Sequence, residues 1–173
     1  EKESLCESCA PGKYGSSTGG ADNRASCTHC AVGRFSETVG AWELNTCTGC
    51  PSGFYIGTTG LTYCLPCQPG AHQPGIGFVT CDACAISKYT RDTKATECLD
   101  CPLGYATYGK TGSSLCIECA VGEYFLQGYC LPCDKGKYRG IDDDVLVCKF
   151  CKAGTFGDRK GNYNCLHCPP GKY

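Results

Sequence analysis

The stretch CPSGFYIGTTGLTYCLPC, residues 50–67, contains the pattern on which the fold depends. Its first cysteine is followed three residues later by Gly53 and five residues later by Tyr55, and a Gly- and Thr-rich stretch then leads to a CxxC pair. A glycine this soon after a cysteine permits a positive φ and a sharp reversal of the chain. The aromatic residue begins a short strand, so the stretch predicts a small irregular β-hairpin bounded by cysteines.

The same pattern recurs along the whole chain. All 20 cysteines belong to CxxC pairs, which begin at Cys6, Cys27, Cys47, Cys64, Cys81, Cys98, Cys116, Cys130, Cys148 and Cys165. A short, nearly constant period predicts an array of units, each too small to bury a core alone. We therefore expect residues 1–173 to form one continuous cysteine-rich array of about ten units of about 17 residues. Because Tyr173 falls just inside a new unit, we also expect a segment of a longer array.

The glycine and the aromatic residue recur in register with the cysteines. Glycine is the third residue after the second cysteine in nine of ten units, with Ser87 as the exception. Tyr or Phe follows two residues later in eight of ten units, and His72 and Ala106 take this place in the other two. We expect the glycine to turn the chain and the aromatic ring to supply most of the buried apolar area. The expected structural repeat residues are Gly12, Tyr14, Gly33, Phe35, Gly53, Tyr55, Tyr89, Gly122, Tyr124, Gly136, Tyr138, Gly154 and Phe156.

The composition is typical of secreted disulfide scaffolds. Leu, Ile, Val and Phe make up about 16% of the chain, too little for an ordinary core, whereas cysteine makes up about 12%. The net charge of −1 provides no positive field for nucleic acid or an anionic membrane. The apolar stretches are far shorter than the roughly 20 residues that cross a bilayer. We expect an extracellular or cell-surface location, protein partners or self-assembly, no nucleic-acid partner and no membrane insertion of this segment.

Four phrases carry a resemblance to a known family: CAPGKY from Cys9, CPSGFY from Cys50, CDKGKY from Cys133 and CPPGKY from Cys168. They resemble the ephrin-receptor-like cysteine-rich repeat, which is similar to modules of tumour necrosis factor receptor ectodomains, and the resemblance covers essentially the whole chain. The predicted fold is a small disulfide-rich one: a tandem array of short irregular β-hairpin repeats that forms an elongated rod, with contacts between neighbouring repeats only and little or no helix.

Two regular disulfide connectivities fit the spacing. In the paired scheme, five modules each hold two bonds, such as Cys6–Cys27 with Cys9–Cys30. We favour the alternative, a ladder, because the intervals do not alternate in length and each carries the same position for Gly and an aromatic residue, although sequence alone leaves both schemes open. The ladder pairs are Cys9–Cys27, Cys30–Cys47, Cys50–Cys64, Cys67–Cys81, Cys84–Cys98, Cys101–Cys116, Cys119–Cys130, Cys133–Cys148 and Cys151–Cys165, with Cys6 and Cys168 pairing outside the segment.

Three chemical alternatives compete with the disulfide interpretation. Paired CxxC motifs at this distance also suit zinc, but zinc ribbons usually place Gly directly after the second cysteine, where this chain has other residues. The pair Cys27–Cys30, with His29 between, is the nearest match to a thioredoxin-like motif. The run Asp142–Asp144 lacks the spaced oxygen ligands of a calcium loop. We therefore predict no catalytic, cofactor-binding or metal-binding residue, no cofactor and no enzyme activity.

Two functions are consistent with these features. The first is an extracellular structural protein: a disulfide-stapled spacer, stalk or fibre segment at a cell surface or on a flagellar or ciliary appendage. The alternative is the cysteine-rich ectodomain of a cell-surface receptor that binds a protein ligand. Trp42, Tyr105 and Tyr108 lie outside the repeat pattern and are the first candidates for a contact surface, with packing between repeats as the alternative. Exposed Ser and Thr residues in the second turn of each unit are candidate sites for O-glycans.

Overall fold

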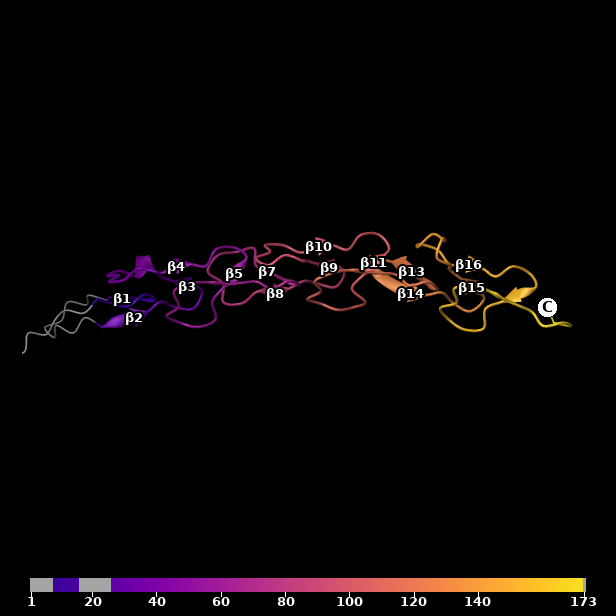
Figure 1. The fold of residues 1–173 in the computed structure, drawn as a ribbon, viewed down its shortest axis with the longest axis horizontal. Coiled ribbons are helices and arrows are strands. Elements are labelled where there is room, and N and C mark those ends of the chain that lie inside the picture. The colour runs from indigo at the N-terminus through magenta and orange to yellow at the C-terminus, as the bar shows by residue number, and fades with distance from the viewer. Residues whose placement is uncertain (1–7, 16–25, 173) are drawn as a thin grey trace, which may run out of the picture. The chain divides into compact units, whose positions relative to one another are not determined.

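The computed structural model describes residues 8–15 and 26–172 of the chain (Figure 1). This part consists of short strands joined by turns, and its one helical element is the 3-10 helix η1 (Leu44–Thr46). It contains no helix with the length and apolar character needed to cross a bilayer. The prediction of a small disulfide-rich fold of tandem hairpins with little helix is confirmed.

Nine antiparallel two-stranded sheets follow one another along the described residues. They are β1 (Lys13–Gly15) with β2 (Cys27–His29), β3 (Arg34–Phe35) with β4 (Thr48–Gly49), β5 (Phe54–Tyr55) with β6 (Leu65–Pro66), β7 (Ala71–His72) with β8 (Asp82–Ala83), β9 (Lys88–Tyr89) with β10 (Leu99–Asp100), β11 (Tyr105–Ala106) with β12 (Ile117–Glu118), β13 (Glu123–Leu126) with β14 (Tyr129–Pro132), β15 (Lys137–Tyr138) with β16 (Lys149–Phe150), and β17 (Thr155–Phe156) with β18 (Leu166–His167).

One repeat, defined as the interval from the second cysteine of one pair to the first cysteine of the next, shows how the pattern produces the hairpin. In repeat 50–64, the amide of Phe54 donates to the carbonyl of Pro51 at 3.1 Å, which closes a four-residue turn. Gly53, the third residue of this turn, has a φ of 81°, the conformation for which glycine is favoured. Tyr55 then pairs with Leu65, so the first strand contains the aromatic residue and the second lies inside the next CxxC pair.

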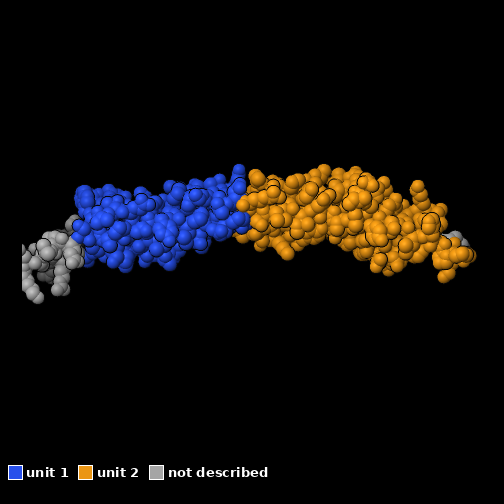
Figure 2. Space-filling model, viewed as in Figure 1, with its two compact units in different colours: residues 1–82, 92–97 blue, residues 83–91, 98–173 orange. Residues whose placement is uncertain are grey.

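The chain divides into two compact units (Figure 2). Unit 1 comprises residues 1–82 and 92–97, and unit 2 comprises residues 83–91 and 98–173. Within each unit the interior consists mainly of cysteine: Cys30, Cys50 and Cys67 in unit 1 and Cys84 and Cys133 in unit 2 are 0–1% exposed. Buried sulfur therefore takes the place that large aliphatic side chains hold in an ordinary core.

The repeat aromatics are not the core that the sequence pattern suggested. Tyr14, Phe35, Tyr55 and other aromatics at this position are half-buried, and Phe156 is exposed. The residue directly after this position is buried in six repeats: Ser36, Ile56, Thr90 and Arg139 follow an aromatic, whereas Gln73 and Thr107 follow His72 and Ala106. Successive side chains in extended backbone point to opposite faces, so when the aromatic lies on the outer face its successor lies on the inner one. None of the aromatics at this position is fully buried, so the innermost side chains of the array are cysteines and these successor residues.

The shortest repeat, from Cys119 to Cys130, forms the longest hairpin. Its strands β13 and β14 have four residues each. The connecting residues Gln127 and Gly128 have φ values of 50° and 86°. Two successive positive φ values are characteristic of the tight turn whose twist matches that of paired strands. A two-residue turn therefore replaces the long second turn found in most other repeats.

Candidate functional site

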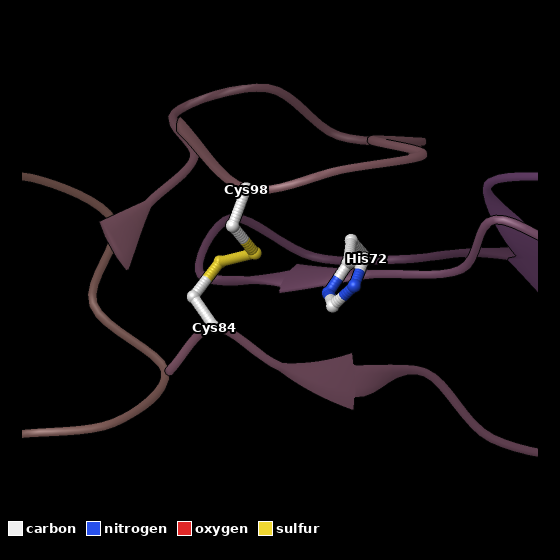
Figure 3. Close-up of side chains that lie close together, drawn as sticks. All are labelled: His72, Cys84 and Cys98. Atoms are coloured by element: carbon white, nitrogen blue, oxygen red, sulfur yellow. A yellow bond between two sulfur atoms is a disulfide. The ribbon is translucent and has the colours of Figure 1, made fainter. Parts of the chain in front are cut away.

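The candidate site is the cysteine ladder itself. Nine disulfides each join the second cysteine of one pair to the first cysteine of the next, and Figure 3 shows one of them, Cys84–Cys98. The others are Cys9–Cys27, Cys30–Cys47, Cys50–Cys64, Cys67–Cys81, Cys101–Cys116, Cys119–Cys130, Cys133–Cys148 and Cys151–Cys165. Cys168 is a free cysteine, and Cys6 lies outside the described residues.

The two cysteines of a CxxC pair bond to different partners. Cys27 is bonded to Cys9 and Cys30 to Cys47, so this pair does not form the internal disulfide of a thioredoxin-like motif. Sulfur atoms in disulfides are not thiolates, the form in which cysteine binds zinc. The arrangement therefore favours crosslinking rather than redox or metal chemistry for the bonded cysteines.

The acidic run at residues 142–144 caps turns. The carboxylate of Asp143 accepts a hydrogen bond from the amide of Gly140 at 2.7 Å and forms an ion pair with Lys149. The hydrogen bond from Lys149 is the largest cause, and the one from the Gly140 amide the next largest, of a pKa of Asp143 below its usual value. Asp144 accepts from the amide of Leu146 at 2.9 Å. Two of the three acids thus have backbone partners in this loop.

Backbone hydrogen bonds tie each repeat to the next. In unit 1, the amide of Gly33 donates to the carbonyl of Ile56 at 2.9 Å, and the amide of Gly60 donates to the carbonyl of Cys30 at 2.9 Å. Both bonds connect repeat 30–47 with repeat 50–64. In unit 2, Gly122 and Gly161 make the equivalent bonds to Arg139 and Cys133. The repeat glycine and the second turn are therefore both points of attachment between neighbours.

Repeats also contact the repeat after next. The carbonyl oxygen of Gly77 faces Gly33 so closely that a Cβ on Gly33 would lie less than 3.0 Å from it. The same contact occurs between Gly12 and Gly60, Gly53 and Lys94, and Gly122 and Gly161. The expectation of neighbour-only contacts is wrong, because the second turn is long enough to extend past the adjacent hairpin, whose paired strands are mostly two residues long.

A single residue in the second turn makes both attachments. The amide of Gly77 donates to Cys50 of the preceding repeat at 2.7 Å, while its carbonyl meets Gly33 one repeat further back. Its φ is 75°, in the left-handed region. Lys94 has the same role in its repeat with a φ of 63°, a conformation that costs a non-glycine residue about 1–2 kcal/mol.

Ser87 shows what happens where the repeat glycine is replaced. It adopts a φ of 65°, and its hydroxyl donates to the carbonyl of Gly128 at 2.9 Å. Gly128 belongs to the second following repeat. A side-chain hydrogen bond therefore takes the place of the close glycine contact, and the link between repeats two apart is retained.

Arg139 is a buried cation in unit 2. Its guanidinium donates to the carbonyls of Cys119 and Ala120 at 2.9 and 2.7 Å, and also to the carbonyl of Glu123. The carboxylate of Glu123 in turn accepts from the hydroxyl of Tyr108 at 2.8 Å. Burial, followed by this bond to Glu123, raises the pKa of Tyr108. These contacts connect three consecutive repeats of unit 2.

The sequence of the array is similar to those of known proteins. Residues 53–101 match the family described as tyrosine-protein kinase ephrin type A/B receptor-like. The chain is an array of ephrin-receptor-like cysteine-rich repeats. The array is 30% identical over 150 residues to signal peptide, CUB and EGF-like domain-containing protein 3 of Mus musculus, with 82% of this chain and 15% of the relative aligned. It is 31% identical over 134 residues to tumor necrosis factor receptor superfamily member 14 of Mus musculus, with 75% and 42% aligned.

A third relative is sushi, von Willebrand factor type A, EGF and pentraxin domain-containing protein 1 of Rattus norvegicus, 30% identical over 121 residues, which are 66% of this chain and 3% of the relative. These relatives are extracellular modular or receptor-like proteins, and the array is an extracellular cysteine-rich module. It spans only 15% of the first relative's length.

The structure places the three candidate contact residues in different settings. Trp42, in unit 1, is 72% exposed. Tyr105 and Tyr108 lie in unit 2 and are 36% and 40% exposed. Tyr108 is bonded to Glu123 and is therefore part of the contacts between repeats, which leaves Trp42 as the more available aromatic side chain.

Sequence reasoning missed the second-turn residue, although a signal was present. The residue four positions before the first cysteine of a pair has a positive φ in five repeats, at Gly60, Gly77, Lys94, Gly112 and Gly161. Four of these five residues are glycine, so the sequence does show a second glycine that recurs at a fixed distance from the cysteines. Its role was not visible, because the partners lie in two other repeats.

We expect Arg139→Ala to lower the free energy of unfolding of the array by about 3 kcal/mol, because three backbone carbonyls lose their donor. Unfolding in guanidinium chloride, followed by circular dichroism, measures the loss. Arg159→Ala is the matched control, since the side chain of Arg159 is 78% exposed and its loss should change the free energy by less than about 0.5 kcal/mol. Equal effects of the two substitutions would show that the Arg139 bonds contribute little.

Proposed function

We propose that the array is a non-catalytic spacer, a stalk or fibre segment that holds other modules at a set distance. The observation that carries the proposal is the attachment of four second turns, at Gly60, Gly77, Lys94 and Gly161, each to the two preceding repeats, as Gly77 attaches to Cys50 and Gly33. Bending between consecutive repeats would break both contacts at once, and the disulfides prevent the repeats from being pulled open. A chain built this way resists extension and collapse within each unit.

The surface of unit 2 is consistent with a spacer role. Three hollows on it have volumes of about 180, 110 and 270 Å³. Sites for small molecules usually enclose about 300–1,000 Å³. The largest of the three is lined by Thr107, Lys110, Thr111, Gly112, Ser113, Ser114, Leu115 and Ile117, most of which are small polar residues. This favours contact with proteins over binding of a small substrate.

For the whole protein, we propose a longer run of the same repeats with the ladder continued along it. Its place would be a cell surface or a flagellar or ciliary appendage, where its partners would be proteins, including further copies of itself. We also propose that exposed hydroxyls of the second turns, such as those of Thr58 and Thr59, accept O-glycans. Sugars there would cover turns without touching the buried ladder.

Small-angle scattering tests the spacer proposal. We expect a radius of gyration clearly above the roughly 16 Å of a compact chain of this length. We also expect the maximum dimension to grow in proportion when repeats are added by duplicating residues 56–89. A compact value, or a dimension that does not grow with added repeats, would rule out the spacer.

A receptor ectodomain is the second candidate. It is favoured by the likeness to a tumor necrosis factor receptor superfamily member and by the exposure of Trp42. A photoreactive residue at position 42 should then crosslink one protein on cells that carry the parent protein, and soluble array should compete for it. The same probe at Val39, which is 67% exposed, serves as the control. Equal capture from both positions would count against a ligand site at Trp42.

A further inference from the structure

One turn of unit 1 presents a large aromatic side chain to solvent on a fixed backbone. Trp42, the only tryptophan of the chain, is 72% exposed, whereas its neighbour Ala41 is 2% exposed. The carbonyl of Ala41 accepts from the amide of Gly15 at 2.8 Å, and the amide of Gly40 donates to the carbonyl of Cys9 at 2.7 Å. Because the backbone before Trp42 is held in place, little conformational freedom is lost when the ring binds a partner.

The Trp42 turn carries negative charge that has no partner. Glu37 and Glu43 flank Trp42 in sequence, and neither forms an ion pair with any residue that the structure describes. Residues 35–87 contain three acidic residues and no Lys or Arg. A surface that binds this turn should therefore be positively charged as well as apolar.

Unit 2 has a hollow with the complementary properties. Its volume is about 180 Å³, and it is lined by Tyr124, Asp134, Lys137, Leu146, Val147 and Cys148. A cavity of about 150 Å³ with apolar walls holds a benzene ring, so this hollow has room for an aromatic side chain. Asp134 is paired with Lys160 at 3.3 Å, whereas the ammonium of Lys137 has no ion pair among the described residues. The charge left over at the hollow is therefore positive.

The apolar wall of the hollow is held in place and remains exposed. Asp144 accepts from the amide of Leu146 at 2.9 Å, and the carbonyl of Val145 accepts from the amide of Phe125 at 2.7 Å. The side chains of Leu146 and Val147 nevertheless face solvent. Residues 134–173 around this wall contain eight Lys or Arg and five acidic residues, the opposite balance to residues 35–87.

We propose that these two features bind one another between two copies of the chain: Trp42 of one copy inserts into the hollow on unit 2 of a second copy. The ring packs against Tyr124 and Leu146, and Glu43, the next residue along the turn, faces the ammonium of Lys137. A Lys ammonium beside a tryptophan ring adds a further attraction. The opposite charges of the two surfaces favour a second copy as the occupant over a partner of another kind.

The contact joins two different surfaces, so a pair of copies still has one free Trp42 and one free hollow. Further copies are added in the same way. This inference rests on the proposed role as a fibre segment, and it adds the partner and the side chains by which segments associate.

Sedimentation equilibrium of the array, with its free thiols alkylated, tests the contact. We expect the average mass to rise with protein concentration. Trp42→Ala should weaken the association at least about 30-fold, the loss typical of a residue that dominates an interface. Ile76→Ala is the matched control and should change it little, because Ile76 is also 72% exposed but residues 68–81 around it contain no carboxylate. A monomeric wild-type array, or equal effects of the two substitutions, would overturn the proposal.

A mixture of two variants tests whether the two surfaces meet. Leu146→Glu places a charge in the hollow and leaves Trp42 intact, whereas Trp42→Ala leaves the hollow intact. Each variant alone should be monomeric, and an equimolar mixture should form pairs and nothing larger. Lys137→Glu is the second variant of the hollow and should behave as Leu146→Glu does. A mixture that stays monomeric with both hollow variants would overturn the proposal.

A photoreactive residue at position 42 identifies the occupant directly. In the purified array it should crosslink to a peptide of a second copy that contains residues 146–148. Capture of a different protein on cells, with no link between copies, would overturn the proposal.

Scattering of the Trp42→Ala monomer distinguishes this contact from the spacer. A long monomer whose wild-type form does not associate leaves the spacer standing without the contact. A compact particle whose wild-type form associates through Trp42 does the reverse.

Discussion

Full reduction is expected to unfold the array, because sulfur makes up most of its interior. Among the described residues, the buried apolar side chains other than cysteine are Ala41, Ile56 and Ala106. A bond that closes a loop of about 15 residues contributes roughly 3 kcal/mol by restricting the unfolded chain, with incomplete additivity among neighbours. Circular dichroism after reduction in native buffer should show an unordered chain, and an unchanged spectrum would contradict the prediction.

The control for this experiment removes a single bond. Replacing Cys50 and Cys64 with serine should lower the free energy of unfolding by about 3 kcal/mol without changing the other linked peptides. Peptide mapping of the unreduced protein should recover Cys30–Cys47 and Cys67–Cys81 as separate pairs. Recovery of Cys9 bonded to Cys30 would instead indicate closed modules and would remove the basis for a continuous ladder.

Gly33→Ala is expected to destabilise the array by about 3 kcal/mol or more. Its Cβ would lie less than 3.0 Å from the carbonyl oxygen of Gly77, a backbone atom held in place by the bond from the Gly77 amide to Cys50. The φ of 77° adds about 1–2 kcal/mol for any residue with a Cβ. Relief would require the second turn to leave both preceding repeats.

Gly154→Ala isolates the contribution of the close contact. Gly154 has a φ of 80°, so it carries the same backbone strain, but its Cβ would meet nothing within 4 Å. The free energy of unfolding should fall by only about 1–2 kcal/mol in Gly154→Ala, the cost of the left-handed conformation alone. Guanidinium unfolding of both variants measures the difference. Equal losses would mean that the second-neighbour contact adds nothing to stability.

Local features of the chain were predictable because they depend on residues close together in sequence. The turn at Gly53 and the strand at Tyr55 follow from one glycine, one aromatic residue and the cysteines that flank them. The extracellular class follows from the abundance of cysteine and the scarcity of aliphatic residues. The ladder was favoured because the intervals between CxxC pairs do not alternate in length and share the same positions for Gly and an aromatic residue. The nine disulfides of the structure have this arrangement.

Other features needed the structure, because they depend on which residues face inward and on repeats that are distant in sequence. The aromatic and its successor lie on opposite faces, and only the packed array shows that the inner face belongs to residues as different as Ile56, Gln73 and Arg139.

The sequence by itself determined a period, a hairpin and an oxidised compartment, since these depend on spacing and local backbone conformation. Only the tertiary structure decided why glycine recurs where it does. At Gly33 the reason is the carbonyl of Gly77 two repeats ahead as well as the turn itself, and at Ser87 a hydroxyl makes the same connection to Gly128. Close approach between backbones is a property of packing, which no local pattern specifies.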